Sequence, residues 1–484
     1  MSTILDVENA IKEAQTKQVA TIDIDFGTIE KVPLHPSYGV PQLHFDQLNV
    51  IAHHLHDMNG FTCPDCNNAD ATSCPQVIAK ATSSPRFSRR ILQQHQDWNM
   101  WQKAEYKMHD DYEQQEMFGK PCWKPHGANV LPFYWDYSRK LTGEYKARCV
   151  VNGAPSQKGS VTLAKTYAAA LEQPGSRIFW ATAANESMYV VGSDATNAFA
   201  EAPPPVAELY VLIDEQYRQW WNHHKERPPI TKGMVLPVRH AIQGHPESPR
   251  LWQQHIDKFL QKLNFISTKH EPCLYQATYK GHRVLFMQQV DDFAIASTDK
   301  AICQEIISHL DSAMTIKIKD LGLITRYNGV DVDQTREYIK IHSHTYIQKI
   351  CKAHGWDTDE TPLHTFPLPM NSEKSYLKQL DDETDNQHID PDDLELQKGF
   401  SYRQAIGELI YAMVTTRPDI SFPVIKLSQF TIRSLPIHFD AVKHLFLYLY
   451  ATSTHSIYYW RQKLVLGLPT GQKPMVKDNP YKKS

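Results

Sequence analysis

The residues best suited to chemistry are two adjacent aspartates, Asp291 and Asp292, in the segment VLFMQQVDDFAIAS at 284–297. Apolar runs on both sides indicate two buried strands, so the pair is expected at the turn of a hairpin. Adjacent carboxylates repel each other, and charge near a core is costly to desolvate. Divalent cations relieve that repulsion, because magnesium prefers hard oxygen ligands. The pattern therefore has two interpretations, a metal site and an exposed acidic type I′ turn.

A third carboxylate, Asp194, closes the short apolar strand predicted in SMYVVGSDATNAF at 187–199. If that strand neighbours the hairpin, Asp194 would complete a cluster of three with Asp291 and Asp292. Two divalent ions about 3.5–4 Å apart can activate an attacking hydroxyl and stabilise the leaving oxygen of a phosphoryl transfer. Phe199 follows Asp194 by five residues and brings a rigid ring to the end of the same strand.

Basic side chains lie on a second predicted hairpin. Residues 130–153 alternate apolar and polar side chains on both sides of Gly143, which predicts two strands joined by a glycine turn. Lys146 and Arg148 lie on the second of these strands. A charged strand edge often protects a sheet from unwanted pairing, but ammonium and guanidinium groups on a rigid hairpin also suit a triphosphate.

A loop with a bare backbone precedes a predicted helix. Ser248 is expected to cap this helix and Pro249 to occupy its first position, and apolar residues follow at helical spacing. Just before it, Gln243 and Gly244 offer a side-chain amide and a backbone without a side chain. Such a backbone allows a ligand to approach closely.

The composition sets the outer limits. A length of 484 residues suggests about three domains and is ample for a sizeable core. The net charge of −3 gives no global signature of nucleic-acid binding, so phosphate contacts would come from a local patch. The start MSTILDVENA lacks the regions of a signal peptide, and no stretch reaches the roughly 18 apolar residues of a membrane span. Eight cysteines are too sparse for a disulfide framework, which favours a reducing, intracellular compartment.

The N-terminal part differs from the rest of the chain. Residues 1–88 contain clusters of Pro, Asn, Ser and Thr, which predict a linker-like extension. Cys63, Cys66 and Cys74, with histidines nearby, could supply zinc ligands. Their spacing matches no common zinc finger, so the sequence leaves zinc binding open.

Helical periodicity marks several later segments. Apolar residues at helical spacing predict helices near 91–104, within 402–417 and within 438–453. The second of these is expected to end before Pro418. An acidic stretch between the helical segments predicts an exposed, mobile linker over 373–398.

Seven motifs in order resemble one family, the reverse transcriptases of copia-type long-terminal-repeat retrotransposons. The resemblance extends from about residue 98 to 460, over most of the chain. The motifs are YKARCVVNG (145–153), SDATNAFAEAPP (193–204), QGHPESPRLW (243–252), HEPCLY (270–275), QVDDFAIA (289–296), IKDLGLITRYNGVDV (318–332) and YRQAIGELIYAMVTTRPDISF (402–422). Each motif alone is weak evidence, but seven motifs in the same order as in the family are very unlikely to arise by chance.

The resemblance implies an α+β, right-hand polymerase fold of fingers, palm and thumb, preceded by a largely irregular N-terminal extension. It assigns 89–345 to fingers and palm, 346–462 to a thumb or connection region and 463–484 to a tail. It further implies an RNA-directed DNA polymerase that uses two Mg²⁺ ions, or Mn²⁺ in their place. The implied partners are a primed RNA or DNA template and deoxynucleoside triphosphates, with no membrane involved.

Residue roles carry over with the motifs. The resemblance implies that Asp194, Asp291 and Asp292 are the catalytic carboxylates that hold both metal ions. It implies nucleotide contacts for Lys146, Arg148, Phe199, Gln243 and Gly244. Phe199 would be the aromatic gate that excludes a 2′-hydroxyl, and the physical interpretation agrees, because a rigid ring can bar an oxygen that RNA has and DNA lacks.

The sequence also departs from the family pattern. Gln289 stands where most relatives carry tyrosine, and HPES at 245–248 stands where many read LKQS. No protease triplet or integrase core is found, and the chain stops where relatives continue into a ribonuclease H domain. A polyprotein fragment or the remnant of a degraded element is therefore expected. Two functions stay open, an active polymerase and a catalytically silent nucleic-acid-binding remnant. In either case the protein is expected inside the cell, in the cytoplasm within virus-like particles or in the nucleus.

Overall fold

The computed structural model describes residues 89–139, 143–153, 166–224, 226–357, 364–368, 373–381 and 391–471, and two short N-terminal strands. These strands, β1 (Thr21–Ile22) and β2 (Val32–Pro33), form an antiparallel pair within the unit Met1–Cys74. The rest of the predicted N-terminal extension, including Cys63, Cys66 and Cys74, lies outside the described residues, as do residues 472–484 of the predicted tail. The elements below belong to the second unit, Pro75–Ser484.

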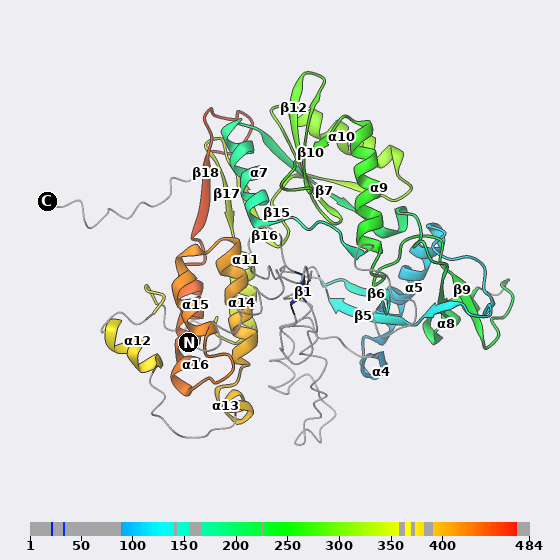
Figure 1. The fold of residues 1–484 in the computed structure, drawn as a ribbon, viewed down its shortest axis with the longest axis horizontal. Helices are drawn as coiled ribbons and strands as arrows, with labels where there is room; N and C mark the ends of the chain where they lie inside the picture. The colour runs from blue at the N-terminus through cyan, green and yellow to red at the C-terminus, as the bar shows by residue number, and fades with distance from the viewer. Residues whose placement is uncertain are drawn as a thin grey trace. The chain divides into compact units, whose positions relative to one another are not determined.

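The six-stranded antiparallel sheet of this unit, called the central sheet below, lies in the upper part of the view in Figure 1. In the described part of the chain its strand order is β10 (Ile266–Ser267), β11 (Leu274–Tyr279), β12 (His282–Gln289), β13 (Asp292–Ser297), β7 (Tyr189–Ala195) and β14 (Ile318–Leu323). Strands β12 and β13 form the hairpin that the two apolar runs predict.

Both faces of this sheet are buried, which explains the continuous apolar runs in its strands. Phe286 and Phe293 join a core that includes residues of α9 (Ser248–Lys262) and α10 (Lys300–Ala313). The alternate residues Met287 and Ala294 join a second core with α7 (Gln173–Asn185) and the strands described next.

A second antiparallel sheet packs against α7. Its order among the described residues is β15 (Arg326–Tyr327), β16 (Val330–Gln334), β17 (Tyr338–His342) and β18 (Ser456–Trp460). The last strand comes from a segment more than a hundred residues later in the sequence, and it lies beside α7.

The basic hairpin forms as predicted within 130–153. Its strands are β5 (Phe133–Arg139) and β6 (Tyr145–Val151), paired antiparallel with Ser138 opposite Lys146 and Asp136 opposite Arg148. Around it lie α4 (Arg89–Leu92), α5 (Trp98–Gln114), α8 (Glu215–His223) and the sheet β3 (Cys122–Trp123), β9 (Met234–Pro237), β8 (Leu209–Leu212), β4 (Asn129–Leu131).

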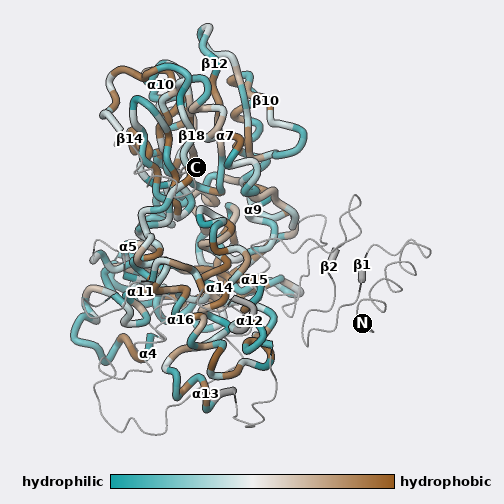
Figure 2. Tube along the Cα trace, turned by 90° about the vertical axis from the view of Figure 1, so that its left-hand side faces the viewer, coloured by the Kyte–Doolittle hydropathy of each residue, from teal (hydrophilic) through white to brown (hydrophobic). Residues whose placement is uncertain are grey.

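The remaining described residues form mainly helices with their own core (Figures 1 and 2). These helices are α11 (His344–Ala353), α12 (Glu373–Asp381), α13 (Pro391–Lys398), α14 (Tyr402–Thr415), α15 (Ser421–Ser428) and α16 (Pro436–Ala451). Helix α14 ends before Pro418, as expected. The α+β class is thereby confirmed, and within the described ranges no helix is long and apolar enough to cross a membrane.

The prediction of a mobile linker over 373–398 is wrong at both ends of that range, where the structure has helices. Residues 373–381 and 391–398 form α12 and α13, whereas 382–390 lie outside the described residues. Leu380 and Leu394 are each only 1% exposed and belong to the helical core. Tyr376 and Leu377 of α12 also pack against this core. The acidic composition hid these contacts, because a few apolar residues in short helices leave little periodicity in the sequence.

Candidate active site

Strand pairing brings the three predicted carboxylates together. Asp292 at the start of β13 is directly opposite Asp194 near the end of β7. Directly opposed residues have Cβ atoms about 4.5–5.5 Å apart, and their side chains leave the same face of the sheet. Asp291 lies in the turn before β13, where its carbonyl accepts a 2.9 Å hydrogen bond from the Ala195 backbone N–H. Each aspartate is therefore adjacent to the other two.

The carboxylates influence one another's ionisation. Burial raises the pKa of Asp292 to about 6, and the charges of Asp291 and Asp194 add to this rise. Reduced hydration also raises the pKa of Asp291, although its side chain is exposed, and the Asp194 charge acts in the same direction. The cluster therefore disfavours three ionised carboxylates unless positive charge is nearby.

Positive charge reaches this cluster from two directions. Arg148 and Lys146 on β6 act electrostatically on Asp291 and oppose the rise of its pKa. On the other side of β7, Lys319 of β14 is the cross-strand neighbour of Asp194, and its Nζ lies 3.2 Å from the Asp194 Oδ2. The basic hairpin thus faces the cluster, while Lys319 contacts one of its members directly.

The donor set suits a hard divalent cation, because three carboxylates gather at one sheet end and repel each other. As the side chains lie here, no group of three or more His, Cys, Asp or Glu among the described residues is arranged to hold a metal ion. The Lys319 ammonium group occupies one oxygen of Asp194 in this arrangement. The residue types and the backbone register fit metal binding, and the ligand oxygens would have to turn toward a shared ion.

Phe199 lies in η1 (Ala198–Glu201), a short 3-10 helix directly after β7. Its ring is half-buried and packs against the core beneath the central sheet. The Glu201 carboxylate anchors this helix, since its Oε2 accepts hydrogen bonds from the backbone N–H groups of Thr315 (2.9 Å) and Ile316 (3.2 Å). Phe199 is therefore held at the Asp194 end of β7.

The loop with Gln243 and Gly244 lies against the end of the basic hairpin. The Gln243 carbonyl accepts a 2.8 Å hydrogen bond from the Val151 N–H. Gly244 has φ +89°, and a Cβ there would lie 2.1 Å from the Val151 carbonyl oxygen. A Cβ on Gly153 would lie 2.3 Å from the Gly244 carbonyl oxygen. The bare backbone expected to face a ligand is thus required by the chain's own close packing.

Ser248 has a role other than the predicted cap. It is the first residue of α9, and the N-cap position is occupied by Glu247, which makes no side-chain capping bond. Instead its Oγ accepts a 3.0 Å hydrogen bond from the Ile242 N–H and donates one of 2.6 Å to the Ile242 carbonyl. These two bonds close the loop that carries Gln243 and Gly244.

Sequence reasoning did not assign a role to Gln289 or Glu271. The Gln289 Oε1 accepts a 3.0 Å hydrogen bond from the Leu171 N–H, and the Glu271 Oε2 accepts one of 2.8 Å from Glu172. Both bonds fix the segment that enters α7. The departure from tyrosine at position 289 therefore places an amide acceptor beside this segment, and only the folded structure reveals its partner.

Comparison with known proteins identifies the family of this chain. Residues 122–369, about half of the chain, match the family described as reverse transcriptase (RNA-dependent DNA polymerase), and the chain belongs to this family. That range contains every candidate catalytic and nucleotide-binding residue. The predicted relationship to copia-type retrotransposons is also confirmed.

Two relatives illustrate the relationship. The Retrovirus-related Pol polyprotein from transposon TNT 1-94 of Nicotiana tabacum is 24% identical over 393 residues, which cover 79% of this chain and 27% of that protein. The corresponding protein from transposon RE1 of Arabidopsis thaliana is 24% identical over 345 residues, covering 69% and 21%. The chain therefore spans about a quarter of the length of these relatives.

Among solved structures, a foamy viral protease-reverse transcriptase in complex with double-stranded DNA is similar over 75% of this chain and 54% of that one. The sequence identity is 11% and the TM-score is 0.36, which is too low to establish a shared fold.

Proposed function

We propose that this chain is an RNA-directed DNA polymerase that extends a primer on an RNA or DNA template. The observation that carries the proposal is the register of β13 against β7, which sets Asp292 directly opposite Asp194 with Asp291 in the adjacent turn. Membership of the reverse transcriptase family supports it. Deoxynucleoside triphosphates are the proposed substrates, and a primed template is the proposed partner.

Asp194, Asp291 and Asp292 would hold two Mg²⁺ ions. Such ions activate the primer hydroxyl and neutralise charge on the transferred phosphate. The chain must keep three ionised carboxylates in one place. Burial and mutual repulsion oppose this ionisation, whereas the cations of the basic hairpin favour it. The proposal requires Lys319 to leave Asp194 when a metal ion is bound, because both compete for the same oxygen.

The remaining candidate residues would contact the nucleotide. Lys146 and Arg148 lie on a rigid strand and carry charge suited to the triphosphate. Gln243 and Gly244 belong to the loop bonded to the end of that strand, so loop and hairpin would bind the nucleotide as one unit. Phe199 would lie beside the sugar and exclude a 2′-hydroxyl.

Primer extension on a homopolymeric RNA template with Mg²⁺ tests this proposal, and Asp291→Asn is the decisive variant. Asparagine keeps the size of the side chain but removes the charge that the metal requires. Loss of an outer-shell partner of a metal ligand reduces activity about 10–100-fold. Because Asp291 is a proposed ligand itself, we expect a larger loss of activity. Template–primer binding should persist, because phosphate contacts with basic residues supply most of the affinity.

Three measurements on the same preparations separate the outcomes. Filter binding should be unchanged in Asp291→Asn, and thermal stability in EDTA should be no lower than that of the wild type, because the substitution removes a charge that repels Asp292. A variant that extends primers like the wild type would exclude Asp291 from catalysis. A wild-type chain that binds primed template but never extends it would make the silent nucleic-acid-binding remnant the correct function.

A further inference from the structure

The turn that carries Asp291 has an unfavourable backbone conformation. Val290 precedes Asp291 and has φ +54°, in the left-handed region. A β-branched residue is a genuine outlier there, and a residue held in this region costs about 1–3 kcal/mol. Its side chain is 41% exposed, so core packing of the valine does not offset this cost. Other contacts must hold the turn.

Two buried side chains donate hydrogen bonds to the Val290 carbonyl oxygen. The Trp252 Nε1–H donates at 2.7 Å and the Gln288 Nε2–H at 3.2 Å. Trp252 is 1% and Gln288 is 3% exposed. The Gln288 Oε1 has no hydrogen-bond partner among the described residues, so the amide keeps its donor on Val290 while its acceptor is left unpaired. An unpaired buried acceptor is itself unfavourable, so the bond to Val290 is the side-chain hydrogen bond that Gln288 has in the described part of the chain.

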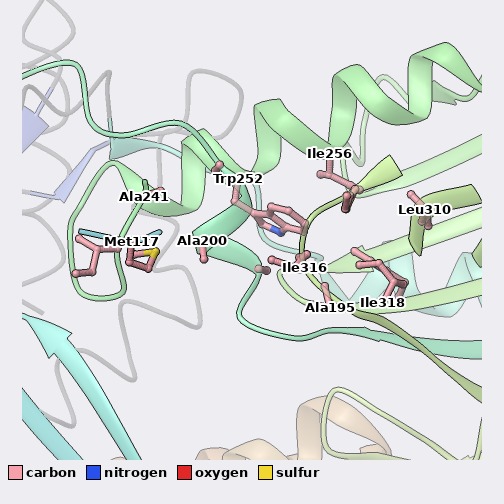
Figure 3. Packing of buried hydrophobic residues seen from close by; sticks show 14 of the residues in the cluster. Met117, Ala195, Ala200, Ala241, Trp252, Ile256, Leu310, Ile316 and Ile318 are labelled. Carbon is pink, nitrogen blue, oxygen red and sulfur yellow. The ribbon is translucent and has the colours of Figure 1, made fainter. Parts of the chain in front are cut away.

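The indole ring has little freedom to move. It projects from α9 into the core, where it lies among buried residues that include Ile256 and Ile316 (Figure 3). His255 stacks on it at a centroid distance of 6.2 Å, and Phe293, the residue after Asp292, stacks at 6.5 Å. A rigid donor of this kind fixes the direction of the carbonyl that accepts its hydrogen bond.

The Val290 carbonyl and the Asp291 N–H belong to one planar peptide unit. Whatever fixes the carbonyl therefore also fixes the N–H. The next peptide unit is held as well, because the Asp291 carbonyl accepts a 2.9 Å hydrogen bond from the Ala195 N–H. The orientation of the Val290–Asp291 peptide unit thus sets the direction in which the Asp291 side chain leaves the backbone. A rotation of the unit would turn the carboxylate away from Asp194 and Asp292.

We propose that Trp252 and Gln288 are positioning residues that hold the strained Val290 peptide and thereby aim the Asp291 carboxylate into the metal-binding cluster. This inference rests on the proposed polymerase function, but it predicts a property that is independent of turnover. The three carboxylates should bind a divalent metal less tightly when either donor is removed.

Trp252→Phe and Gln288→Leu test the inference in the full chain. Phenylalanine keeps an aromatic ring but cannot donate, and leucine removes the Gln288 donor together with its unpaired acceptor. Trp220→Phe is the matched control, because Trp220 is also buried and its Nε1–H also donates at 2.7 Å, but to Asp110 in a different part of the unit.

Two readouts are needed. In primer extension, kcat should fall about 10–100-fold, the loss expected when a reacting group is misplaced by about 1 Å, while KM for the nucleotide stays within about twofold. In a titration with Mn²⁺ alone, without nucleic acid, affinity should fall about 10–100-fold, as it does when metal ligands lose their supporting bonds. Trp220→Phe should leave both quantities at wild-type values.

Wild-type kcat and wild-type Mn²⁺ affinity in both test variants would overturn the inference. If the wild type binds Mn²⁺ but does not extend primers, the proposed function fails, and the Mn²⁺ titrations alone decide whether the two residues position Asp291. If Trp252→Phe does not fold, Gln288→Leu decides, because it deletes no packed ring. A loss of thermal stability with unchanged Mn²⁺ affinity would assign Trp252 a packing role only.

Discussion

Asp194 and Asp292 face each other across two paired strands, an arrangement that destabilises the fold by itself. Like charges directly opposite in a sheet repel, and burial raises the pKa of Asp292 further, to about 6. An acidic turn with no other role would place its charges in solvent, where hydration screens them. The observed placement therefore favours a bound cation over the simple acidic turn.

Phe199→Val tests the role of the ring beside this cluster. The smaller side chain should open space for a 2′-hydroxyl, so incorporation of ribonucleotides relative to deoxynucleotides should rise at least about tenfold, as expected for one steric contact in a pocket. Use of deoxynucleotides should stay near wild type, since no carboxylate is removed. Competition between the two substrates on one primed template measures the ratio.

Phe259→Val provides the control for this substitution. Phe259 on α9 is also half-buried and packs against the same core, but it does not follow a site strand. It should lose comparable stability without any change of sugar selectivity. If Phe199→Val instead reduces the use of both substrates equally, Phe199 is a packing residue.

The sequence reveals these residues unequally. The carboxylates follow apolar strand patterns, so local sequence is sufficient to propose them. Trp252 shows only the spacing of a core helix residue, and its hydrogen-bond partner is about forty residues away in the sequence. Gly244 was expected to offer a bare backbone to a ligand, and the structure shows that close packing against Val151 already requires one. Such partners depend on tertiary structure.

At the scale of elements, the two hairpins and helix α9 could be predicted from alternation, turn residues and periodicity. The order β13, β7, β14 could not, because nothing local to these strands specifies which of them become neighbours. That order places Lys319 beside Asp194, so the ion pair was equally hidden from sequence reasoning. Strand pairing is thus the step at which the candidate site becomes visible.

Gly153→Ala tests whether the basic hairpin must dock on the Gln243–Gly244 loop. The added methyl group would lie 2.3 Å from the Gly244 carbonyl oxygen and 2.5 Å from the Pro246 Cδ, so backbone has to shift. We expect a loss of about 1–3 kcal/mol in unfolding free energy, typical of overpacking. The KM for deoxynucleotides should also rise, because the shifted strand carries Lys146 and Arg148.

Gly407→Ala is the matched control for this substitution. Gly407 lies inside α14, and a Cβ there meets no atom of the described chain within 4 Å. Alanine should stabilise this helix by about 0.5–1 kcal/mol and leave the KM unchanged. Denaturant unfolding and steady-state kinetics of both variants check the pair, and a Gly153→Ala variant as stable as the wild type would contradict the close approach.

At the scale of the whole second unit, separate cores stabilise different regions, and some family motifs serve those cores. In the TTRPDI segment, Arg417 is fully buried and pairs with the Asp419 carboxylate through two hydrogen bonds of 2.8 and 2.9 Å. It also donates to the Thr452 carbonyl at 3.1 Å. This motif therefore joins helices of the C-terminal core, and its presence reports the fold rather than the chemistry.

His109 makes the stability of the unit depend on pH. It lies on α5, 1% exposed, against the rings of Trp135, Tyr217 and Trp220, and neither ring nitrogen has a hydrogen-bond partner among the described residues. Burial lowers its pKa from 6.5 to about 3. The folded chain therefore keeps His109 neutral, whereas the unfolded chain protonates it below pH 6.5. The stability contribution is complete above that pH and is lost as the pH falls toward 3.

His109→Phe should remove this contribution to the pH dependence. Between pH 7 and pH 5, protonation of the unfolded chain at His109 should cost the wild type about 2 kcal/mol, given an ordinary histidine pKa of about 6.5. As the pH falls from 7 to 5, the wild type should therefore lose about 2 kcal/mol more unfolding free energy than the variant. Urea unfolding at the two pH values measures the shift, and both proteins share every other titrating group. Parallel pH profiles would mean that His109 is protonated in the folded chain, with a polar partner or water beside its ring.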